Sequence, residues 1–360
     1  MHRSKPSPVI RTRRVVQVAF LALVVWLGVQ FSLWALAHTA GRGPTFSRPP
    51  GIEGFLPISA LMSLRLALAG GGIHPVHPAG LAILVAVLVM SALVAKSFCS
   101  HLCPIGTLSE GLGRLGVRLL GRTWLLPRRL DIPLRALKYI LLALFLWATW
   151  VTLDLHGVRA FLDSPYNKVA DTKMLLFFAH PSRLTVGVVG ALVIGSVLVR
   201  DLWCRYLCPY GALVGIVGRV APLKVARDAR TCIDCRKCTK ACPARLPVHA
   251  MARMDSVECT SCQDCVAVCP IRDCLAVRPA RPAAAWLVRP ALAVGLAAGI
   301  YLGVTVTFRA SGHWRGAVSE GEYARRLQEI DSPLYTHVGG MTSAETRPGT
   351  ASLVQSHGPR

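Results

Sequence analysis

Residues 232–243 read CIDCRKCTKACP, and residues 259–270 read CTSCQDCVAVCP. Both segments have the spacing Cys-x2-Cys-x2-Cys-x3-Cys-Pro, and together they hold most of the chain's 13 cysteines. Thiolates at this spacing suit iron, because three neighbouring cysteines wrap one face of a cube-shaped iron–sulfur cluster and a fourth arrives from elsewhere. The stretch from 232 to 270 therefore predicts a small unit built around metal clusters.

This spacing is typical of bacterial proteins with two [4Fe–4S] clusters, in which the fourth cysteine of each run ligates the other cluster. We therefore assign one cluster to Cys232, Cys235, Cys238 and Cys269, and the second to Cys259, Cys262, Cys265 and Cys242. A zinc site needs only four ligands and has no use for two complete runs that each end in proline. A disulfide framework would need an oxidising compartment, which the topology predicted below disfavours.

The composition indicates a membrane protein. Hydrophobic residues make up 53% of the 360 residues and charged residues only 16%, whereas a soluble domain carries about 25% charged residues. A net charge of +23 would also suit nucleic-acid binding. The basic residues gather beside apolar segments, however, as expected for cytoplasmic loops near anionic lipid. We therefore expect membrane lipid as a partner and no nucleic acid.

Apolar segments divide the rest of the chain. A helix that spans a bilayer takes about 20 apolar residues, and the segments that approach this length are 15–38, 79–98, 133–153, 184–203 and 290–308. Residues 54–70 are shorter and contain Pro57 and Arg65, which favours a re-entrant or interfacial helix. The predicted fold is an all-α polytopic membrane protein with about five transmembrane helices, into which an α+β ferredoxin-like domain is inserted.

The predicted domains are an N-terminal segment 1–14, a membrane domain 15–221, the ferredoxin-like domain 222–280, the last transmembrane helix within 281–308 and a polar tail 309–360. Loop charge predicts their orientation, since cytoplasmic loops carry an excess of Lys and Arg. Residues 99–138 contain many more basic residues than acidic ones. We therefore expect the N-terminus and both clusters on the cytoplasmic side of a bacterial inner membrane and the tail in the periplasm.

The polar tail contains one predicted helix. Ser319 and Glu322 have the spacing of a capping box before a short amphipathic segment. From Gly339 onward the composition predicts disorder.

Two further cysteine pairs form an internal repeat. FCSHLCPIGTL (98–108) contains Cys99 and Cys103, and WCRYLCPYGAL (203–213) contains Cys204 and Cys208. Positions i and i+4 share a helix face, so each pair can point at one object. The four thiols are interpreted as ligands of a third metal centre or as redox-active thiols, in preference to buried apolar side chains. Cys274 has no partner in these motifs and is interpreted as a buried structural thiol.

With two Cys-x3-Cys-Pro motifs at helix ends and a two-cluster run after them, the chain resembles the NapH/NosR/CcoG family of membrane polyferredoxins, which includes YccM-like proteins. The resemblance covers residues 15–308. It implies that electrons pass from quinol towards a periplasmic reductase, or that the protein serves the assembly of metal centres. The segments outside 15–308 are too short for the flavin-binding domain of NosR or the immunoglobulin-like domain of CcoG. The resemblance is therefore nearest to the NapH/YccM-like core.

A quinol site needs an apolar pocket with a proton acceptor. Candidates on the expected outer side are Arg65, His74, His77 and Asp171, together with Asp163, Tyr166 and Lys173. Arg65 is an ionisable residue inside an apolar segment, which suggests a functional role. The alternative for every one of these residues is ordinary, namely a helix cap, an ion pair or a side chain that snorkels to the interface.

The predicted function is that of a membrane-bound iron–sulfur protein, either an electron carrier or a component of a quinol dehydrogenase. It would relay electrons between a quinol pool or a cytoplasmic donor and a partner reductase, within a complex. Its expected cofactors are two [4Fe–4S] clusters, while a third metal centre and a quinone are left open. Two alternatives are an accessory protein that reduces metal or thiols during assembly of a respiratory enzyme, and a redox-sensing membrane regulator. No glycine-rich phosphate loop occurs, so a nucleotide cofactor is not expected.

Overall fold

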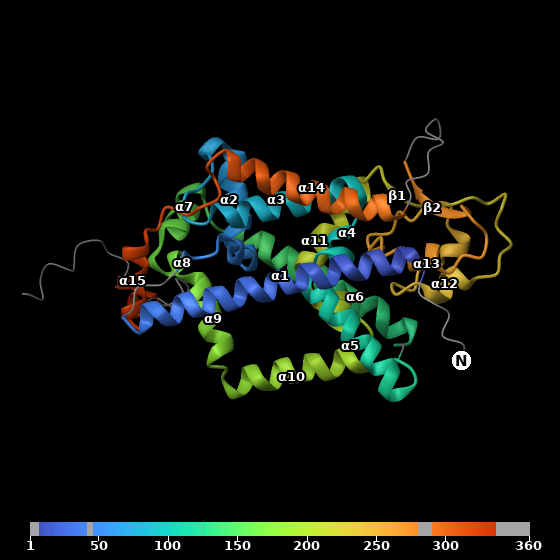
Figure 1. Ribbon diagram of the computed structural model, residues 1–360, viewed down its shortest axis with the longest axis horizontal. Coiled ribbons are helices and arrows are strands. Elements are labelled where there is room, and N and C mark those ends of the chain that lie inside the picture. Colours follow the sequence, from blue (N-terminus) through green and yellow to red (C-terminus); the bar gives the residue numbers. More distant parts are fainter. Residues whose placement is uncertain (1–6, 42–45, 125, 280–289, 336–360) are drawn as a thin grey trace, which may run out of the picture.

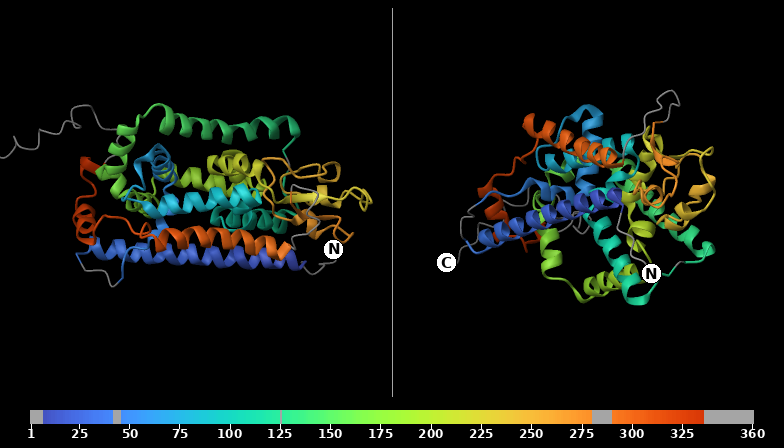
Figure 2. Two further views of the ribbon diagram at one scale, coloured as in Figure 1. Left: turned by 90° about the horizontal axis from the view of Figure 1, so that it is seen from above. Right: turned by 45° about the vertical axis from the view of Figure 1, so that its right-hand side comes forward.

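The computed structural model describes residues 7–41, 46–124, 126–279 and 290–335. Most of these residues are helical, and the helices α1, α3 and α14 run side by side along the longest axis of the molecule (Figures 1 and 2). The first part of the chain contains α1 (Pro8–Thr39), η1 (Pro50–Phe55), α2 (Pro57–Leu66), η2 (Ala67–Gly71), α3 (Pro78–Val94), α4 (Ser97–His101), α5 (Pro104–Leu120), α6 (Arg128–Leu146), η3 (Trp147–Val151), α7 (Leu155–Asp163), α8 (Pro165–Lys168) and α9 (Ala170–Ala179).

The second part contains residues 222–279, which carry both cysteine runs and which we call the insert, and the C-terminal helices. Its elements are α10 (Arg183–Leu198), η4 (Trp203–Leu207), α11 (Pro209–Val217), η5 (Gly218–Val220), β1 (Lys224–Arg227), α12 (Lys237–Ala241), η6 (Val248–Ala250), α13 (Asp264–Ala267), β2 (Leu275–Arg278), α14 (Pro290–Ala310), α15 (Glu320–Gln328) and η7 (Pro333–Tyr335).

Within the described residues, 3 helices are long and apolar enough to cross a membrane: Pro8–Thr39, Arg128–Val151 and Leu292–Ala310. Helices α9 and α10 are also long and apolar enough when they are taken together as one span, and the chain bends by 81° between them. By length and composition the part of the chain that the structure describes thus contains 3 or 4 candidate spans. The sequence predicted about five, and the predicted segments 79–98 and 184–203 account for the difference.

Segment 79–98 forms the shorter helix α3, which ends at Val94 because Ala95 adopts a left-handed backbone with φ of 53°. Most side chains of α3 are buried against α2, η1, α11 and α14. A helix that is hydrophobic all round belongs in a protein core as readily as in lipid, so composition alone could not separate the two. Segment 184–203 ends early as well, because α10 stops at Leu198.

The region 154–183, which lies between two of the predicted spans, contains the short helices α7, α8 and α9. The short segment 54–70 forms α2 and η2, which end at Gly71. Met62 and Leu66 of α2 pack on Val158 and Leu162 of α7. This packing explains how a helix too short to span the bilayer is held, and its re-entrant or interfacial placement stays a prediction.

The insert lies at the end of the molecule where α1 begins (Figure 1). Its strands β1 and β2 pair antiparallel, with Val225 opposite Val277. Both valines are buried in a core that also contains Val248, Met254 and Leu275. This core is the scaffold on which the cysteine runs are carried.

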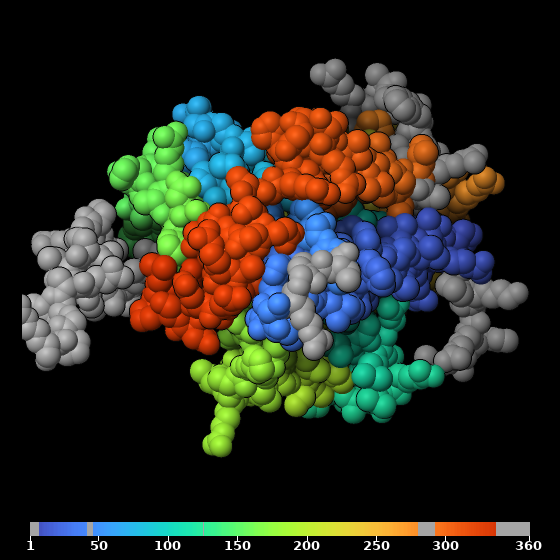
Figure 3. Space-filling model, turned by 60° about the vertical axis from the view of Figure 1, so that its left-hand side comes forward, coloured from blue at the N-terminus to red at the C-terminus, as the bar shows by residue number. Residues whose placement is uncertain are grey.

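Helix α15 covers the opposite end of the molecule, where it lies beside the end of α1 (Figure 3). Ser319 Oγ accepts a hydrogen bond from the backbone N–H of Glu322 at 3.2 Å, as the capping-box spacing predicts. Tyr323 and Leu327 of α15 pack on Phe31 and Trp34 of α1. Residues from Gly339 onward, where disorder is predicted, lie outside the described residues.

Candidate iron–sulfur centres

Two cavities in the insert are lined by the two predicted sets of cysteines. Cys232, Cys235, Cys238 and Cys269 line one, which we call the distal cavity, and Cys242, Cys259, Cys262 and Cys265 line the other, the proximal cavity. The empty space at each cavity, including the open solvent at its mouth, is about 350 Å³. The fourth cysteine of each run lines the cavity of the other run, which is the exchange that the spacing predicts.

The backbone of both runs turns in the same way around its cavity. Asp234 and Arg236 have φ of 51° and 58°, and Ser261 and Gln263, at the equivalent positions of the second run, have φ of 53° and 63°. Alternation with left-handed residues directs successive backbone N–H groups to one side and forms a nest for an anion. An all-thiolate [4Fe–4S] cluster is such an anion, so the backbone as well as the donor set fits it.

The backbone N–H groups of these turns donate hydrogen bonds to the thiols. Hydrogen bonds from the backbone of Asp234 lower the pKa of the Cys232 thiol. Cys259 receives the equivalent bond from Ser261, but burial dominates and raises its pKa to about 11. Metal is bound by thiolates, and a metal cation offsets the cost of burying their negative charge. Cys259 is therefore suited to act as a metal ligand and is poorly suited to remain a thiolate without metal.

Cys274 is buried at 2% exposure, as the sequence predicted, but it also lines the distal cavity. Its Sγ lies 3.6 Å from the carbonyl oxygen of Asp228. Sequence reasoning missed this position because Cys274 falls outside the spacing of both runs.

We expect Cys274→Ala to keep the full iron content, because the four cysteines of the motif suffice for the distal cavity. Cys269→Ala should lose about four irons per chain, the content of one cluster. Iron analysis of the two variants, purified anaerobically, makes the comparison. Equal iron loss in both would assign Cys274 a ligand role and contradict the expectation.

The two membrane-side cysteine pairs occupy equivalent places in the repeat. Cys103 and Cys208 each directly precede a helix, α5 and α11, and Cys208 Sγ accepts the N–H of Gly211 at 3.2 Å. Gly106 makes the matching backbone bond to Cys103. A Cβ on Gly106 would lie 2.2 Å from the carbonyl oxygen of Cys99. Gly106 therefore lets the backbone of α5 approach its own cysteine pair closely.

The four thiols gather in one place, which we call the membrane-side cysteine set (Cys99, Cys103, Cys204 and Cys208). Burial raises the pKa of the Cys204 thiol, and the neighbouring charges of Cys103, Cys208 and Cys99 raise it further. Such mutual effects require the four sulfurs to be close. The sequence predicted that each pair could point at one object, and the fold brings the two pairs together.

Hydrogen bonds tie this set to the proximal cavity. Ser100, next to Cys99, donates from Oγ to the carbonyl oxygen of Thr260, next to Cys259, at 2.6 Å. Arg205, next to Cys204, donates from Nη1 to the carbonyl oxygen of Pro243, next to Cys242, at 3.1 Å. Both halves of the repeat therefore bind the insert through residues adjacent to candidate ligands.

Two charged contacts strengthen the same junction. Arg13 of α1 donates to the carbonyl oxygen of Cys262 at 3.1 Å and pairs with Asp264 at 3.1 Å. Lys138 of α6 pairs with Glu258 at 2.6 Å, and Tyr139 donates to the same carboxylate at 2.8 Å. These contacts hold the proximal cavity against the helices.

Four of the candidates for a quinol site, namely Arg65, His74, His77 and Asp171, have protein partners. Arg65 Nη1 donates to the carbonyl oxygens of Thr149 and Leu153 at 2.7 and 2.6 Å, where it caps the end of η3. His74 pairs with Asp163 at 3.2 Å. Lys173, also a candidate, donates to the carbonyl oxygen of Ile330 at 2.5 Å.

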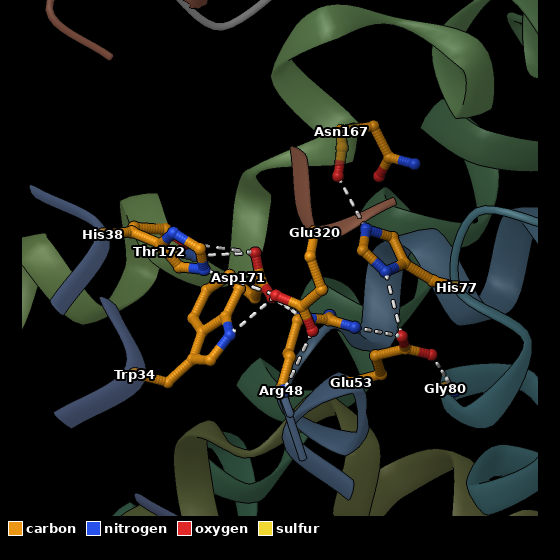
Figure 4. Close-up of polar contacts among 10 residues, drawn as sticks. All are labelled: Trp34, His38, Arg48, Glu53, His77, Gly80, Asn167, Asp171, Thr172 and Glu320. Carbon is orange, nitrogen blue, oxygen red and sulfur yellow. Dashed lines mark hydrogen bonds and ion pairs between the residues drawn. The ribbon is translucent and has the colours of Figure 1, made fainter. Parts of the chain in front are cut away.

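His77 and Asp171 belong to one buried network, drawn in Figure 4. His77 Nε2 contacts the carbonyl oxygen of Asn167 at 2.6 Å, and its Nδ1 lies 3.4 Å from Glu53. Arg48 joins Glu53 and Asp171, with distances of 2.9 and 2.6 Å. Sequence reasoning missed Arg48 and Glu53, because Arg48 stands in a loop and Glu53 in the short helix η1, and neither has a motif around it.

Glu320 of the chain's last part closes the same network. Its carboxylate accepts from Trp34 Nε1 at 2.9 Å and lies 3.3 Å from His38 Nε2 (Figure 4). The network thus joins α1, the loop before η1, α3, α9 and the segment that starts α15. This arrangement stabilises the end of the molecule opposite the insert.

Comparison with known proteins relates the chain to iron–sulfur proteins. A family model described as a 4Fe-4S binding domain matches residues 76–123 and 181–227, and one described as a 4Fe-4S dicluster domain matches residues 224–270. The "Putative electron transport protein YccM" of Escherichia coli is 42% identical over 90% of this chain and 91% of its own length. No solved structure matches.

Two more distant relatives share parts of the chain. The "Ferredoxin-type protein NapH" of Escherichia coli is 28% identical over 71% of this chain and 85% of its own length. The "Regulatory protein NosR" of Pseudomonas aeruginosa is 30% identical over 46% of this chain and 22% of its own length.

Proposed function

The chain belongs to the family of membrane polyferredoxins that includes YccM and NapH, and from that premise we propose that it relays electrons through three iron–sulfur centres. The centres would be held by the distal cavity, the proximal cavity and the membrane-side cysteine set. Electron transport and [4Fe–4S] binding fit the family, while the number of centres, their ligands and the order in which electrons visit them are the proposal.

The observation that carries this proposal is the pair of hydrogen bonds from Ser100 to Thr260 and from Arg205 to Pro243. Each bond joins a residue beside a membrane-side cysteine to a residue beside a proximal-cavity cysteine. The distal cavity shares its cysteine runs with the proximal one through the exchange of Cys242 and Cys269. The proposed path therefore runs from the distal cavity through the proximal cavity to the membrane-side set, or in the reverse direction.

A [4Fe–4S] cluster supplies a one-electron carrier when bound, and each set of four thiols matches its ligand requirement. The chain's own residues hold the sites together and exclude water. Phe98 and Tyr210 pack around Cys99 and Cys103, and apolar surroundings of this kind limit solvent access to a centre.

We propose that the insert faces the cytoplasm, where the reducing environment preserves thiolate ligands. A quinone of the membrane or a partner reductase would exchange electrons with the membrane-side set. Helix α10 exposes Leu184, Val188 and Ile194, an apolar surface that suits lipid and a lipid-soluble carrier. Arg65, His74, His77 and Asp171 stay candidates for contact with quinone, although all four already have protein partners.

Iron content tests the number of centres. Protein purified anaerobically should contain about twelve irons per chain, and Cys99→Ala and Cys208→Ala should each lower the content to about eight. The two variants should keep the spectra of the two insert clusters, because the insert has its own core. About eight irons in the unmodified protein would exclude a third cluster and favour redox-active thiols at the membrane-side set.

Reduction by quinol tests the relay. Mixing with a reduced quinol analogue should reduce the clusters of the unmodified protein, and Cys208→Ala should slow this reduction strongly while dithionite still reduces the insert clusters. Absence of any response to quinol, combined with reduction of Cu(II) by the protein, would favour the alternative role in the assembly of a metal enzyme.

A further inference from the structure

The two cysteine runs have the same backbone but opposite surroundings. Ser261 and Gln263 of the second run are 5% and 3% exposed, because the proximal side of the insert packs on the helices. The side chains of Asp234 and Arg236, at the equivalent positions of the first run, are 61% and 63% exposed. One turn is therefore covered by the membrane part of this chain, and its counterpart is open to another molecule.

The open turn and its neighbours form a basic surface with an apolar centre. Ile233 is 62% exposed, and Cys235, which lines the distal cavity, is exposed beside it. The exposed cations around them are Arg230, Arg236, Lys237, Lys240 and Arg272. We name these five residues with Ile233 the port surface.

The acids on this surface do not cancel its charge. Asp234 lies 3.8 Å from Arg236, and Asp273 lies 3.8 Å from Arg272. Arg230, Lys237 and Lys240 add positive charge beyond these two pairs. The port surface is thus net positive around a candidate redox centre.

We propose that the port surface docks an acidic electron-carrier protein, which exchanges one electron with the centre in the distal cavity. The inference deepens the proposed relay and rests on it. In the forward direction the reduced carrier loses one electron and the distal centre gains it, so no bond breaks and no proton transfer is required. Complementary charge steers such encounters and speeds association, and the exposed Ile233 supplies the apolar contact at the centre of a small, transient interface.

The position of the port surface favours a soluble protein over lipid. The turn before α12 lies at the extreme end of the insert, beyond the ends of α1 and α14 (Figures 1 and 2). A membrane that surrounds the long helices would leave this end in water.

Rapid mixing of the full-length, cluster-loaded protein in detergent with a reduced flavodoxin of acidic isoelectric point tests the proposal. The double variant Arg236→Glu/Lys237→Glu should lower the second-order rate of cluster reduction by about tenfold or more at low salt. The rate of the unmodified protein should fall as salt rises, since screening weakens steering. Dithionite, a small reductant, should reduce the clusters of both proteins equally.

The matched control is Arg118→Glu/Arg122→Glu, which makes the same change of charge at exposed positions of α5 and of the turn after it. The control should react with flavodoxin at a rate within about twofold of the unmodified protein. An unchanged rate in the port variant, or an equal loss in the control, would overturn the docking proposal. Failure of the relay has a different signature, namely fast reduction of the insert clusters by flavodoxin and no electron transfer to the membrane-side centre.

Discussion

Replacing Arg48 with methionine should lower the free energy of unfolding by about 3 to 5 kcal/mol, because one substitution leaves two buried carboxylates without their cation. Arg48 Nε donates to Asp171 at 2.6 Å and Nη1 donates to Glu53 at 2.9 Å. Both carboxylates are 0% exposed. Methionine retains an apolar stem but offers neither charge nor donor. Thermal unfolding in detergent, followed by tryptophan fluorescence, measures the loss.

The loss should shrink as the pH falls. Burial acts to raise the pKa of Glu53, but His77 and the Arg48 guanidinium hold it below its ordinary value. In the native protein this carboxylate therefore adds stability above its unfolded pKa and loses it as the pH falls through the folded pKa. Without Arg48, burial should raise the pKa, so the folded variant binds a proton that the unfolded chain releases, and acid stabilises it.

The unfolding midpoints of the two proteins should therefore converge between neutral and mildly acidic pH. Arg183→Met is the matched control, because Arg183 is exposed at the start of α10. Its effect should stay within about 0.5 kcal/mol. If the difference in the free energy of unfolding between Arg48→Met and the native protein does not change with pH, unpaired carboxylates are not the cause of the loss.

The cysteine motifs made the insert predictable, because metal ligation fixes both residue type and spacing. The four cysteines around each cavity could be assigned from the sequence, since the exchange of Cys242 and Cys269 follows from the motif itself. From the repeat, the sequence predicted that each membrane-side pair can point at one object. It did not show that the two pairs lie together in the fold. Which cavity lies next to them depends on single contacts such as Ser100 to Thr260, and no local pattern contains that information.

The network around Arg48, unlike the cysteine motifs, could not be predicted from the sequence. His77 and Asp171 drew attention as ionisable residues near apolar segments, but their partners Arg48 and Glu53 stand elsewhere in the chain without a motif. Pairing across such distances is decided by tertiary packing, which hydrophobic periodicity does not encode. The length of α3 was missed for a related reason, since a buried helix and a lipid-exposed one have the same composition.

Lys96 is the second residue whose replacement should have a large effect. It is 5% exposed and lies along a face of α11 and η5 made of Gly211, Gly215 and Gly218. A Cβ on Gly215 would lie 3.7 Å from Lys96 Cδ and 2.6 Å from the carbonyl oxygen of Val257. The three glycines, at helical spacing, thus leave a channel that an extended lysine fills.

The channel directs the ammonium of Lys96 between two candidate centres. A Cβ on Gly211 would lie 3.7 Å from Lys96 Nζ and 3.5 Å from Cys208 Sγ. The positive charge of Lys96 acts both on Cys99 of the membrane-side set and on Cys259 of the proximal cavity. A cation in this position favours the reduced, more negative form of each centre, and so raises both reduction potentials.

Lys96→Met should therefore lower the midpoint potentials of the proximal and membrane-side centres by on the order of 60 mV, a tenfold change in a one-electron equilibrium. Potentiometric titration followed by electron paramagnetic resonance measures the shift. Lys96→Arg keeps the charge and should restore most of the potential. Lys240→Met, which removes an exposed cation from the distal run, should leave these two potentials unchanged.

The distal centre supplies the internal reference for this experiment. Its cavity is formed by Cys232, Cys235, Cys238 and Cys269, away from the glycine channel, so its potential and the iron content should be the same in Lys96→Met as in the native protein. A general loss of folding would change all the centres together. If all three potentials stay at their native values in Lys96→Met, the buried charge does not tune the relay, and the glycine channel serves only the packing of α11 against the insert.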